Sequence, residues 1–271
     1  MSSSPPPTAV IIKINGVSVP VPGGPGVDLA RATSCVPFVD WAASMDPSLE
    51  VRGVHVSEVD MFGARVGFLK MRADVRRDGV EIPGIVFCRG GAVAILPLLT
   101  CGGERFVVCC RQPRVPIGAA AFLEIPAGML DGEGDFVGVA VKELQEETGL
   151  TLEARELVDL SALAWGARAG VPAPRGLYPS VGACDEHLRL LLYARSCSPE
   201  ELASLRGRAT GNLAEGEVIT LDVMPLVDLW RHCSDAKTLA ALYLLEKLEA
   251  QGVVTVPSEG RAAEGPERGA K

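Results

Sequence analysis

Several features are scarce in or absent from this sequence of 271 residues, and each absence removes a class of protein. No run of about 18 apolar residues occurs, so we expect no membrane-spanning helix. Acidic residues outnumber basic ones by 34 to 26, and the resulting net charge of −8 argues against a nucleic-acid backbone as the main partner. The three histidines are dispersed and the eight cysteines include no C-x-x-C pair, so we expect no Cys/His zinc site.

The cysteines and the two ends of the chain give expectations about its location in the cell and about disorder. A chain of this length can bury a full core without disulfides, so we expect reduced thiols and a cytoplasmic location, with an organelle left open. Residues 1–8 are rich in serine and proline and lack the charged and apolar regions of a signal peptide. We expect this segment and the polar tail, residues 256–271, to be disordered.

The sequence between these ends divides at about residue 90. Residues 9–90 contain short apolar runs separated by turn signals such as D-M-F-G and R-D-G, which predict a small antiparallel β subdomain. Residues 91–255 alternate strand-like runs with helical patterns, which predict an α/β sandwich. The strands expected there are 92–99, 105–111, 157–165, 188–194 and 217–224, and two of the helices expected are 198–206 and 234–252. Pro97 predicts a bulge or a sheet edge in the first of these strands.

One segment, residues 128–150, concentrates acidic side chains. It ends in K-E-L-Q-E-E-T-G-L, which places Glu143, Glu146 and Glu147 at helical spacings of three and four. Carboxylates crowded on one helix repel each other, and a hard divalent cation such as magnesium offsets that repulsion because it prefers oxygen ligands. A solvated acidic face is the alternative interpretation. The flanking glycines, and the apolar residues between the acids, favour a metal site.

This segment resembles the Nudix box, G-x5-E-x7-R-E-U-x-E-E-x-G-U, in which U is an aliphatic residue. The matching positions are Gly128, Glu143, Leu144, Glu146, Glu147, Gly149 and Leu150. Gly134 and Lys142 depart from the pattern, because the family has glutamate and arginine at these two positions. In the family those two side chains pair and brace the loop against the helix. Changing both partners together is less costly than leaving one buried charge without its partner.

The similarity extends over roughly residues 10–255. Outside the box, several motifs resemble those of plant-type ADP-sugar diphosphatases, a group related to UDP-sugar and ADP-ribose diphosphatases. These motifs are D-M-F-G, R-Q-P-R-V-P, E-I-P-A-G-M-L-D, G-A-C-D-E, and D-L-W-R followed by D-A-K. The resemblance implies a Nudix α/β/α sandwich with a small N-terminal antiparallel β subdomain, which in relatives supports a homodimer and helps to form the substrate pocket. The implied reaction is hydrolysis of the diphosphate bridge of a nucleotide sugar, giving a nucleoside monophosphate and a sugar 1-phosphate.

The same resemblance implies a metal site. Magnesium, with manganese as a substitute, would stabilise charge on the phosphates and acidify a coordinated water. The implied metal ligands are Glu143, Glu146, Glu147 and Glu217, joined by the backbone carbonyl of Ala127. Bacterial relatives carry a general base two residues from a late metal ligand, which implies Glu215 as the base, and Glu146 is a second candidate catalytic residue. Two solvated loop acids are the alternative for positions 215 and 217.

Four further residues are implied in substrate binding. Arg114 matches a family arginine that contacts a substrate phosphate, a role suited to its fixed fork of donors, and Arg111 is a second candidate. Asp185 and Glu186 lie on a segment that in relatives lines the far end of the pocket, where they would accept hydrogen bonds from sugar hydroxyls. For the arginines an ordinary surface role is the alternative, and for the two acids a structural turn.

Two other functions remain open on the sequence. A non-catalytic Nudix-fold module that binds a nucleotide sugar would account for Gly134 and Lys142. An isomerase-type Nudix chemistry would need a catalytic cysteine, and Cys184 is the only cysteine near a candidate loop. The base and sugar are open too, with ADP-glucose the first expectation and UDP-glucose or ADP-ribose the others, because an altered loop at residues 165–174 flanks the expected pocket.

Overall fold

The computed structural model describes residues 9–130, 136–166, 173–212 and 216–257, and these residues form two compact units. The first unit comprises the described residues up to Gly91 together with Tyr178–His187. The second comprises the described residues from Ala92 to Leu177 and from Leu188 onward. In the part of the chain described, no helix is both long and apolar enough to cross a membrane.

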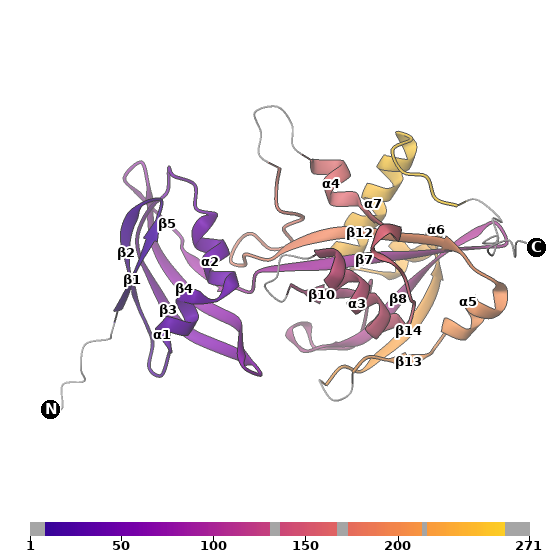
Figure 1. Cartoon of the computed structure of the whole chain (residues 1–271), viewed down its shortest axis with the longest axis horizontal. Helices are drawn as coiled ribbons and strands as arrows, with labels where there is room; N and C mark the ends of the chain where they lie inside the picture. The colour runs from indigo at the N-terminus through magenta and orange to yellow at the C-terminus, as the bar shows by residue number, and fades with distance from the viewer. Residues whose placement is uncertain (1–8, 131–135, 167–172, 213–215, 258–271) are drawn as a thin grey trace, which may run out of the picture. The chain divides into compact units, whose positions relative to one another are not determined.

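The first unit is an antiparallel β structure covered by two short helices (Figure 1). Its elements are β1 Ala9–Ile14, β2 Val17–Pro22, α1 Leu29–Ser34, α2 Val36–Ala43, β3 Glu50–Phe62, β4 Arg65–Arg77, β5 Val80–Ile82 and β6 Ile85–Cys88. Phe38 and Trp41 of α2 pack with Leu69 of β4 in one buried cluster. The predicted R-D-G turn is confirmed, because Asp78 and Gly79 both have positive φ, at 52° and 78°, as a two-residue hairpin turn requires.

The second unit contains the larger sheet, with strand order β11-β12-β7-β8-β14-β13, to which β10 is added beside β7 and β9 beside β8. Its strands are β7 Gly91–Cys101, β8 Glu104–Arg114, β9 Ala119–Glu124, β10 Ala127–Met129, β11 Leu157–Asp159, β12 His187–Ser196, β13 Ala209–Thr210 and β14 Ile219–Pro225. Its helices are α3 Phe136–Thr148, α4 Leu160–Trp165, α5 Pro199–Leu205, α6 Leu226–His232 and α7 Ala236–Ala250, with short 3-10 turns at Val115–Ile117 and Ala154–Glu156.

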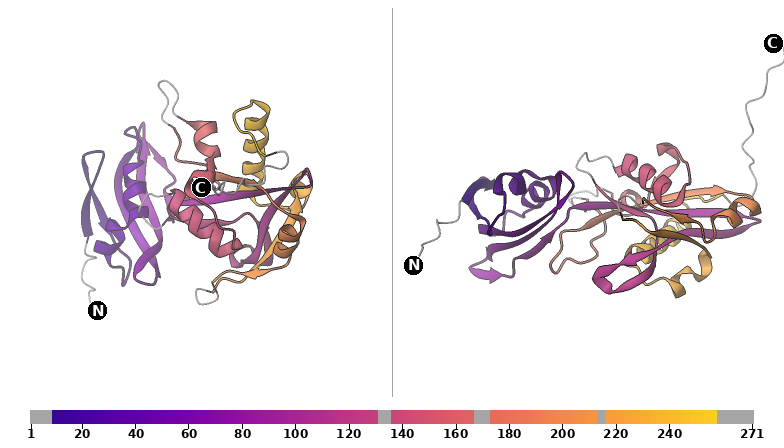
Figure 2. Two further views of the ribbon diagram at one scale, coloured as in Figure 1. Left: turned by 45° about the vertical axis from the view of Figure 1, so that its right-hand side comes forward. Right: turned by 90° about the horizontal axis from the view of Figure 1, so that it is seen from below.

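Alternation along β7 explains why helices cover both faces of this sheet. Side chains of successive strand residues point to opposite faces. Val93 and Ile95 belong to a core cluster that includes residues of α3 and α5, whereas Ala94 and Leu96 belong to a second cluster that includes residues of α4, α6 and α7. Figure 2 shows helices on both sides of the sheet. The predicted α/β/α sandwich with a small N-terminal antiparallel β subdomain is therefore confirmed.

Two expectations about the strands of this unit were wrong in part. Residues 157–165 form a three-residue strand and then helix α4, because Asp159 caps that helix by accepting a 2.7 Å hydrogen bond from the backbone N–H of Ala162. Pro97 lies inside an inner strand, not at a sheet edge, and the bulge that the sequence also allowed stays a prediction. Pro97 falls where the neighbour of β7 changes from β10, paired through Ala94, to β8, paired from Leu98, so no ladder bond to either strand is needed from it.

Candidate active site

The rotation of helix α3 separates its acidic side chains. Ala140 and Leu144 are fully buried against the sheet, and Glu147, three residues after Leu144, is carried into the interior with only 4% of its surface exposed. Glu146 lies on the side of the helix away from Leu144. It is exposed, and its carboxylate lies 3.8 Å from the Lys142 ammonium one turn earlier. The metal-binding and catalytic roles suggested for Glu146 therefore remain predictions.

The surroundings of Glu147 strongly shift the pKa of its carboxyl group. It accepts a 3.1 Å hydrogen bond from the backbone N–H of Ala127 and a longer one, at 3.7 Å, from the Cys110 thiol. Burial raises the pKa of Glu147 to about 8, and repulsion from Glu143, with smaller contributions from Glu124 and Glu217, adds to the effect. The hydrogen bond from Ala127 works in the opposite direction, but it does not overcome the burial.

Gly128 shows how closely Glu143 approaches the neighbouring backbone. A Cβ atom at Gly128 would overlap the carboxyl group of Glu143, so only glycine leaves room for that side chain. The carboxylate of Glu143 therefore lies against β10, the strand whose first residue, Ala127, donates to Glu147. Two predicted metal ligands of helix α3, Glu143 and Glu147, thus lie against strand β10, which contains a third, Ala127.

The donor set of this site fits a hard divalent cation. Carboxylate and carbonyl oxygens are the ligands that magnesium and manganese prefer. Two box glutamates lie near each other, and their mutual repulsion helps to raise the pKa of the buried one, which is the situation that a bound cation relieves. No set of three or more His, Cys, Asp and Glu side chains among the described residues already has the arrangement of a complete metal site. The fit therefore rests on the chemistry of the donors.

Strand β13, which precedes the loop expected to supply Glu217, is attached to the end of helix α3. Thr210 donates a 2.5 Å hydrogen bond to the backbone carbonyl of Glu147, and the Arg208 guanidinium donates to the carbonyl of Thr148. Further along, the backbone N–H of Asn212 lies 3.3 Å from a carboxylate oxygen of Glu217. Glu215, the predicted base, lies outside the described residues, as does Gly134 of the box.

The two candidate phosphate-binding arginines are each held by a carboxylate. Arg111 donates to Asp222 at 2.8 Å, and Arg114 donates through Nε to Glu124 at 2.6 Å. Glu124, which pairs with Arg114, was not among the predicted site residues. It was visible as an acid in the otherwise apolar motif F-L-E-I-P-A-G, at the end of a strand and only three residues before Ala127.

Asp185 and Glu186 belong to the first unit, where local groups already engage them. Asp185 accepts hydrogen bonds from the backbone N–H groups of Arg89, at 2.7 Å, and Gly90, at 3.2 Å. Glu186 lies 3.1 Å from the Arg89 guanidinium. These contacts stabilise the chain segment around Arg89, and sugar binding by the two acids remains a prediction. Cys184, which an isomerase-type chemistry would need, has its thiol pKa raised, mainly by burial.

Comparison with known proteins places this geometry in a family. The profile of the NUDIX domain matches residues 89–243. Over 216 residues the chain is 42% identical to the chloroplastic Nudix hydrolase 14 of Arabidopsis thaliana, a match that covers 78% of this chain and 67% of that protein. Over 166 residues it is 31% identical to the ADP-ribose pyrophosphatase of Bacillus subtilis (strain 168), covering 59% of this chain and 74% of that one. A crystal structure of an ADP compounds hydrolase superposes with a TM-score of 0.48 at 18% identity, covering 78% of this chain and 100% of that one. The chain therefore belongs to the Nudix family and is one of its hydrolases.

Proposed function

We propose that this protein hydrolyses the diphosphate bridge of a nucleotide sugar with the help of magnesium, releasing a nucleoside monophosphate and a sugar 1-phosphate. The observation that carries the proposal is the buried carboxyl of Glu147, which accepts from the backbone of Ala127 while Glu143 lies against the adjacent Gly128. A site that concentrates negative charge in the interior binds a cation more readily than a bare anionic phosphate. The name of the Bacillus subtilis relative, an ADP-ribose pyrophosphatase, supports the same class of bond.

In this reaction the residues of the chain would bind the metal, bind the diphosphate and accept a proton. Glu143, Glu147 and the carbonyl of Ala127 would hold the metal, and Glu146 and Glu217 would complete the ligand set. A bound magnesium ion supplies charge stabilisation on the phosphate oxygens and an acidified water. Arg114 would bind the diphosphate through its terminal N–H groups, because its Nε is engaged by Glu124. Glu215 would accept the proton from the attacking water.

We further propose that the first unit contributes to a homodimer and to the substrate pocket, as the family resemblance implies. Asp185 and Glu186 would then act on the sugar. ADP-glucose is the first substrate to try, followed by UDP-glucose and ADP-ribose. Light scattering coupled to size-exclusion chromatography measures the mass in solution directly. A mass of one chain at micromolar concentration would remove the dimer from the account.

A turnover screen tests the proposed reaction. The purified protein would be incubated with ADP-glucose, UDP-glucose, GDP-mannose and ADP-ribose, with and without magnesium, and the products separated by chromatography. Magnesium-dependent release of a nucleoside monophosphate and a sugar 1-phosphate is the expected result. Nucleotide binding without turnover of any of the four would instead identify the chain as a binding module.

A further inference from the structure

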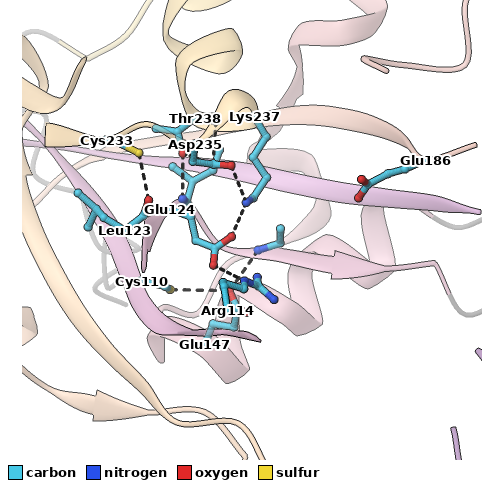
Figure 3. Close-up of polar contacts among 12 residues, drawn as sticks. Cys110, Arg114, Leu123, Glu124, Glu147, Glu186, Cys233, Asp235, Lys237 and Thr238 are labelled. Atoms are coloured by element: carbon cyan, nitrogen blue, oxygen red, sulfur yellow. Dashed lines mark hydrogen bonds and ion pairs between the residues drawn. The ribbon is translucent and has the colours of Figure 1, made fainter. Parts of the chain in front are cut away.

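Glu124 is a buried carboxylate at the end of β9, with 2% of its side chain exposed. Burying an ionised carboxyl is costly unless both of its oxygens find partners. Here both do: Oε1 accepts from Arg114 Nε at 2.6 Å, and Oε2 is paired with the Lys237 ammonium. Figure 3 shows Glu124 between these two cations. The carboxylate therefore joins the candidate phosphate-binding arginine to a lysine more than a hundred residues away in the sequence.

Lys237 is itself fixed at the start of helix α7. Its side chain is 11% exposed, and its ammonium lies 3.1 Å from Asp235, the N-cap residue of the helix. Asp235 also accepts hydrogen bonds from the backbone N–H of Thr238, at 3.1 Å, and from the Thr238 hydroxyl, at 2.6 Å. The D-A-K motif thus builds a helix cap and a buried cation together.

The same cap reaches back to the strand that carries Glu124. The backbone N–H of Ile125, the next residue, donates to the Thr238 hydroxyl at 3.1 Å. Both the backbone and the side chain at this point of the chain are therefore held by the first turn of α7. Two cations, Arg114 and Lys237, balance two anions, Glu124 and Asp235, so the network as a whole carries no net charge.

Arg114 differs from the other members of the network in its exposure. Its side chain is 41% exposed, whereas those of Glu124, Lys237 and Asp235 are nearly buried. Among the described residues, the one hydrogen-bond partner of its guanidinium group is Glu124, reached through Nε. An arginine whose Nε is fixed can present its terminal N–H groups as a preformed fork for a phosphate, without losing side-chain freedom on binding.

We propose that Glu124, held by Lys237 and Asp235, is the positioning residue for Arg114 and sets its guanidinium to receive the diphosphate of the substrate. This inference rests on the proposed function for the nature of the anion. It differs from a purely stabilising role, in which the network would hold α7 to the sheet and leave anion binding unchanged.

The test is a double-mutant cycle on the binding of ADP, which carries the diphosphate group but has no sugar to release. Calorimetry in the presence of magnesium would compare wild type, Glu124→Gln, Arg114→Ala and the double variant. We expect each single change to weaken ADP binding about tenfold, the size of a lost charge-assisted hydrogen bond. The double variant should bind no more weakly than Arg114→Ala, because Glu124 acts through Arg114.

A matched control removes a glutamate that pairs with an arginine elsewhere in the same unit. Glu201 pairs with Arg195, and Glu201→Gln should leave ADP affinity within twofold of wild type. If Glu124→Gln does not fold, as judged by its thermal melt, Lys237→Met replaces it in the cycle, because it removes the second partner of the same carboxylate. Steady-state kinetics add a further readout, since a positioning defect raises KM more than it lowers kcat.

The outcomes separate this inference from the proposed function. Multiplicative losses in the double variant, or unchanged ADP affinity in folded Glu124→Gln protein, would overturn it. So would a wild-type protein that binds no ADP. If the cycle shows the expected lack of additivity but no nucleotide sugar is hydrolysed, the role of Glu124 stands and the proposed reaction falls.

Discussion

The hydroxyl of Thr210 donates a 2.5 Å hydrogen bond to the backbone carbonyl of Glu147, which ties β13 to the last turn of helix α3. The carbonyls at the end of a helix have no partner within it, and here a threonine and the neighbouring Arg208 supply donors. Strand β13, which precedes Glu217 in the chain, is thereby attached to the helix that carries Glu147. The hydrogen bond therefore links two regions that carry predicted metal ligands, helix α3 and the chain that follows β13, although they are far apart in the sequence.

Thr210→Val tests this attachment. The substitution keeps the shape of the side chain and removes the donor, so we expect a loss of about 1 kcal/mol in the free energy of unfolding. We also expect turnover to fall about threefold to tenfold, because the loop with Glu217 is held less well. Chemical denaturation and initial rates give the two numbers. Thr210→Ser keeps the hydroxyl and serves as the control. Equal activity of the valine and serine variants would show that the attachment has no part in catalysis.

Gly128→Ala tests the close approach of Glu143 to β10. The added methyl group would overlap the Glu143 carboxyl, so the side chain must leave its position. We expect turnover to fall roughly tenfold or more while the fold survives, since a displaced metal ligand disturbs the geometry of the reacting groups. Gly182→Ala is the matched control, because a Cβ there meets nothing within 4 Å. Activity of Gly128→Ala within twofold of wild type would remove Glu143 from the site.

The raised pKa of Glu147 predicts how stability changes with pH in metal-free protein. Its folded pKa of about 8 lies above the ordinary glutamate value of 4.5, so between these values the folded state holds a proton that the unfolded state has released. The contribution of this group to stability should therefore be fully present at and below pH 4.5 and should be lost as the pH rises through about 8. Thermal melting in a chelator, compared with Glu147→Gln, isolates the effect. A melting temperature with the same pH dependence in both proteins would show that Glu147 does not titrate in this way.

Lys142→Arg restores the residue that the family pattern has at this position. Among the described residues, Lys142 forms an ion pair with the exposed Glu146, and exposed pairs of this kind contribute about 0–1 kcal/mol. We expect turnover to stay within about threefold of wild type, measured as initial rates under saturating magnesium. A large drop would show that lysine is specifically required.

Much of this structure follows from local patterns in the sequence. The turn at Asp78 and Gly79, the serine cap of α5 and the acidic helix α3 were all predictable, because each depends on neighbours in the chain. The strand expected at residues 157–165 was not, because the N-cap at Asp159 outweighs the apolar pattern. The pairing of Glu124 with Lys237 was beyond such patterns as well, since it joins a strand end to a distant helix cap.

The most direct test of the central claim is hydrolysis of the best nucleotide sugar by wild-type and Glu147→Gln protein across a magnesium titration. If Glu147 holds the metal, wild-type turnover should rise with magnesium and saturate. The variant should then be slower by roughly a hundredfold or more, with an unchanged fold. A Glu147→Gln protein within threefold of wild type at every magnesium concentration would contradict the account.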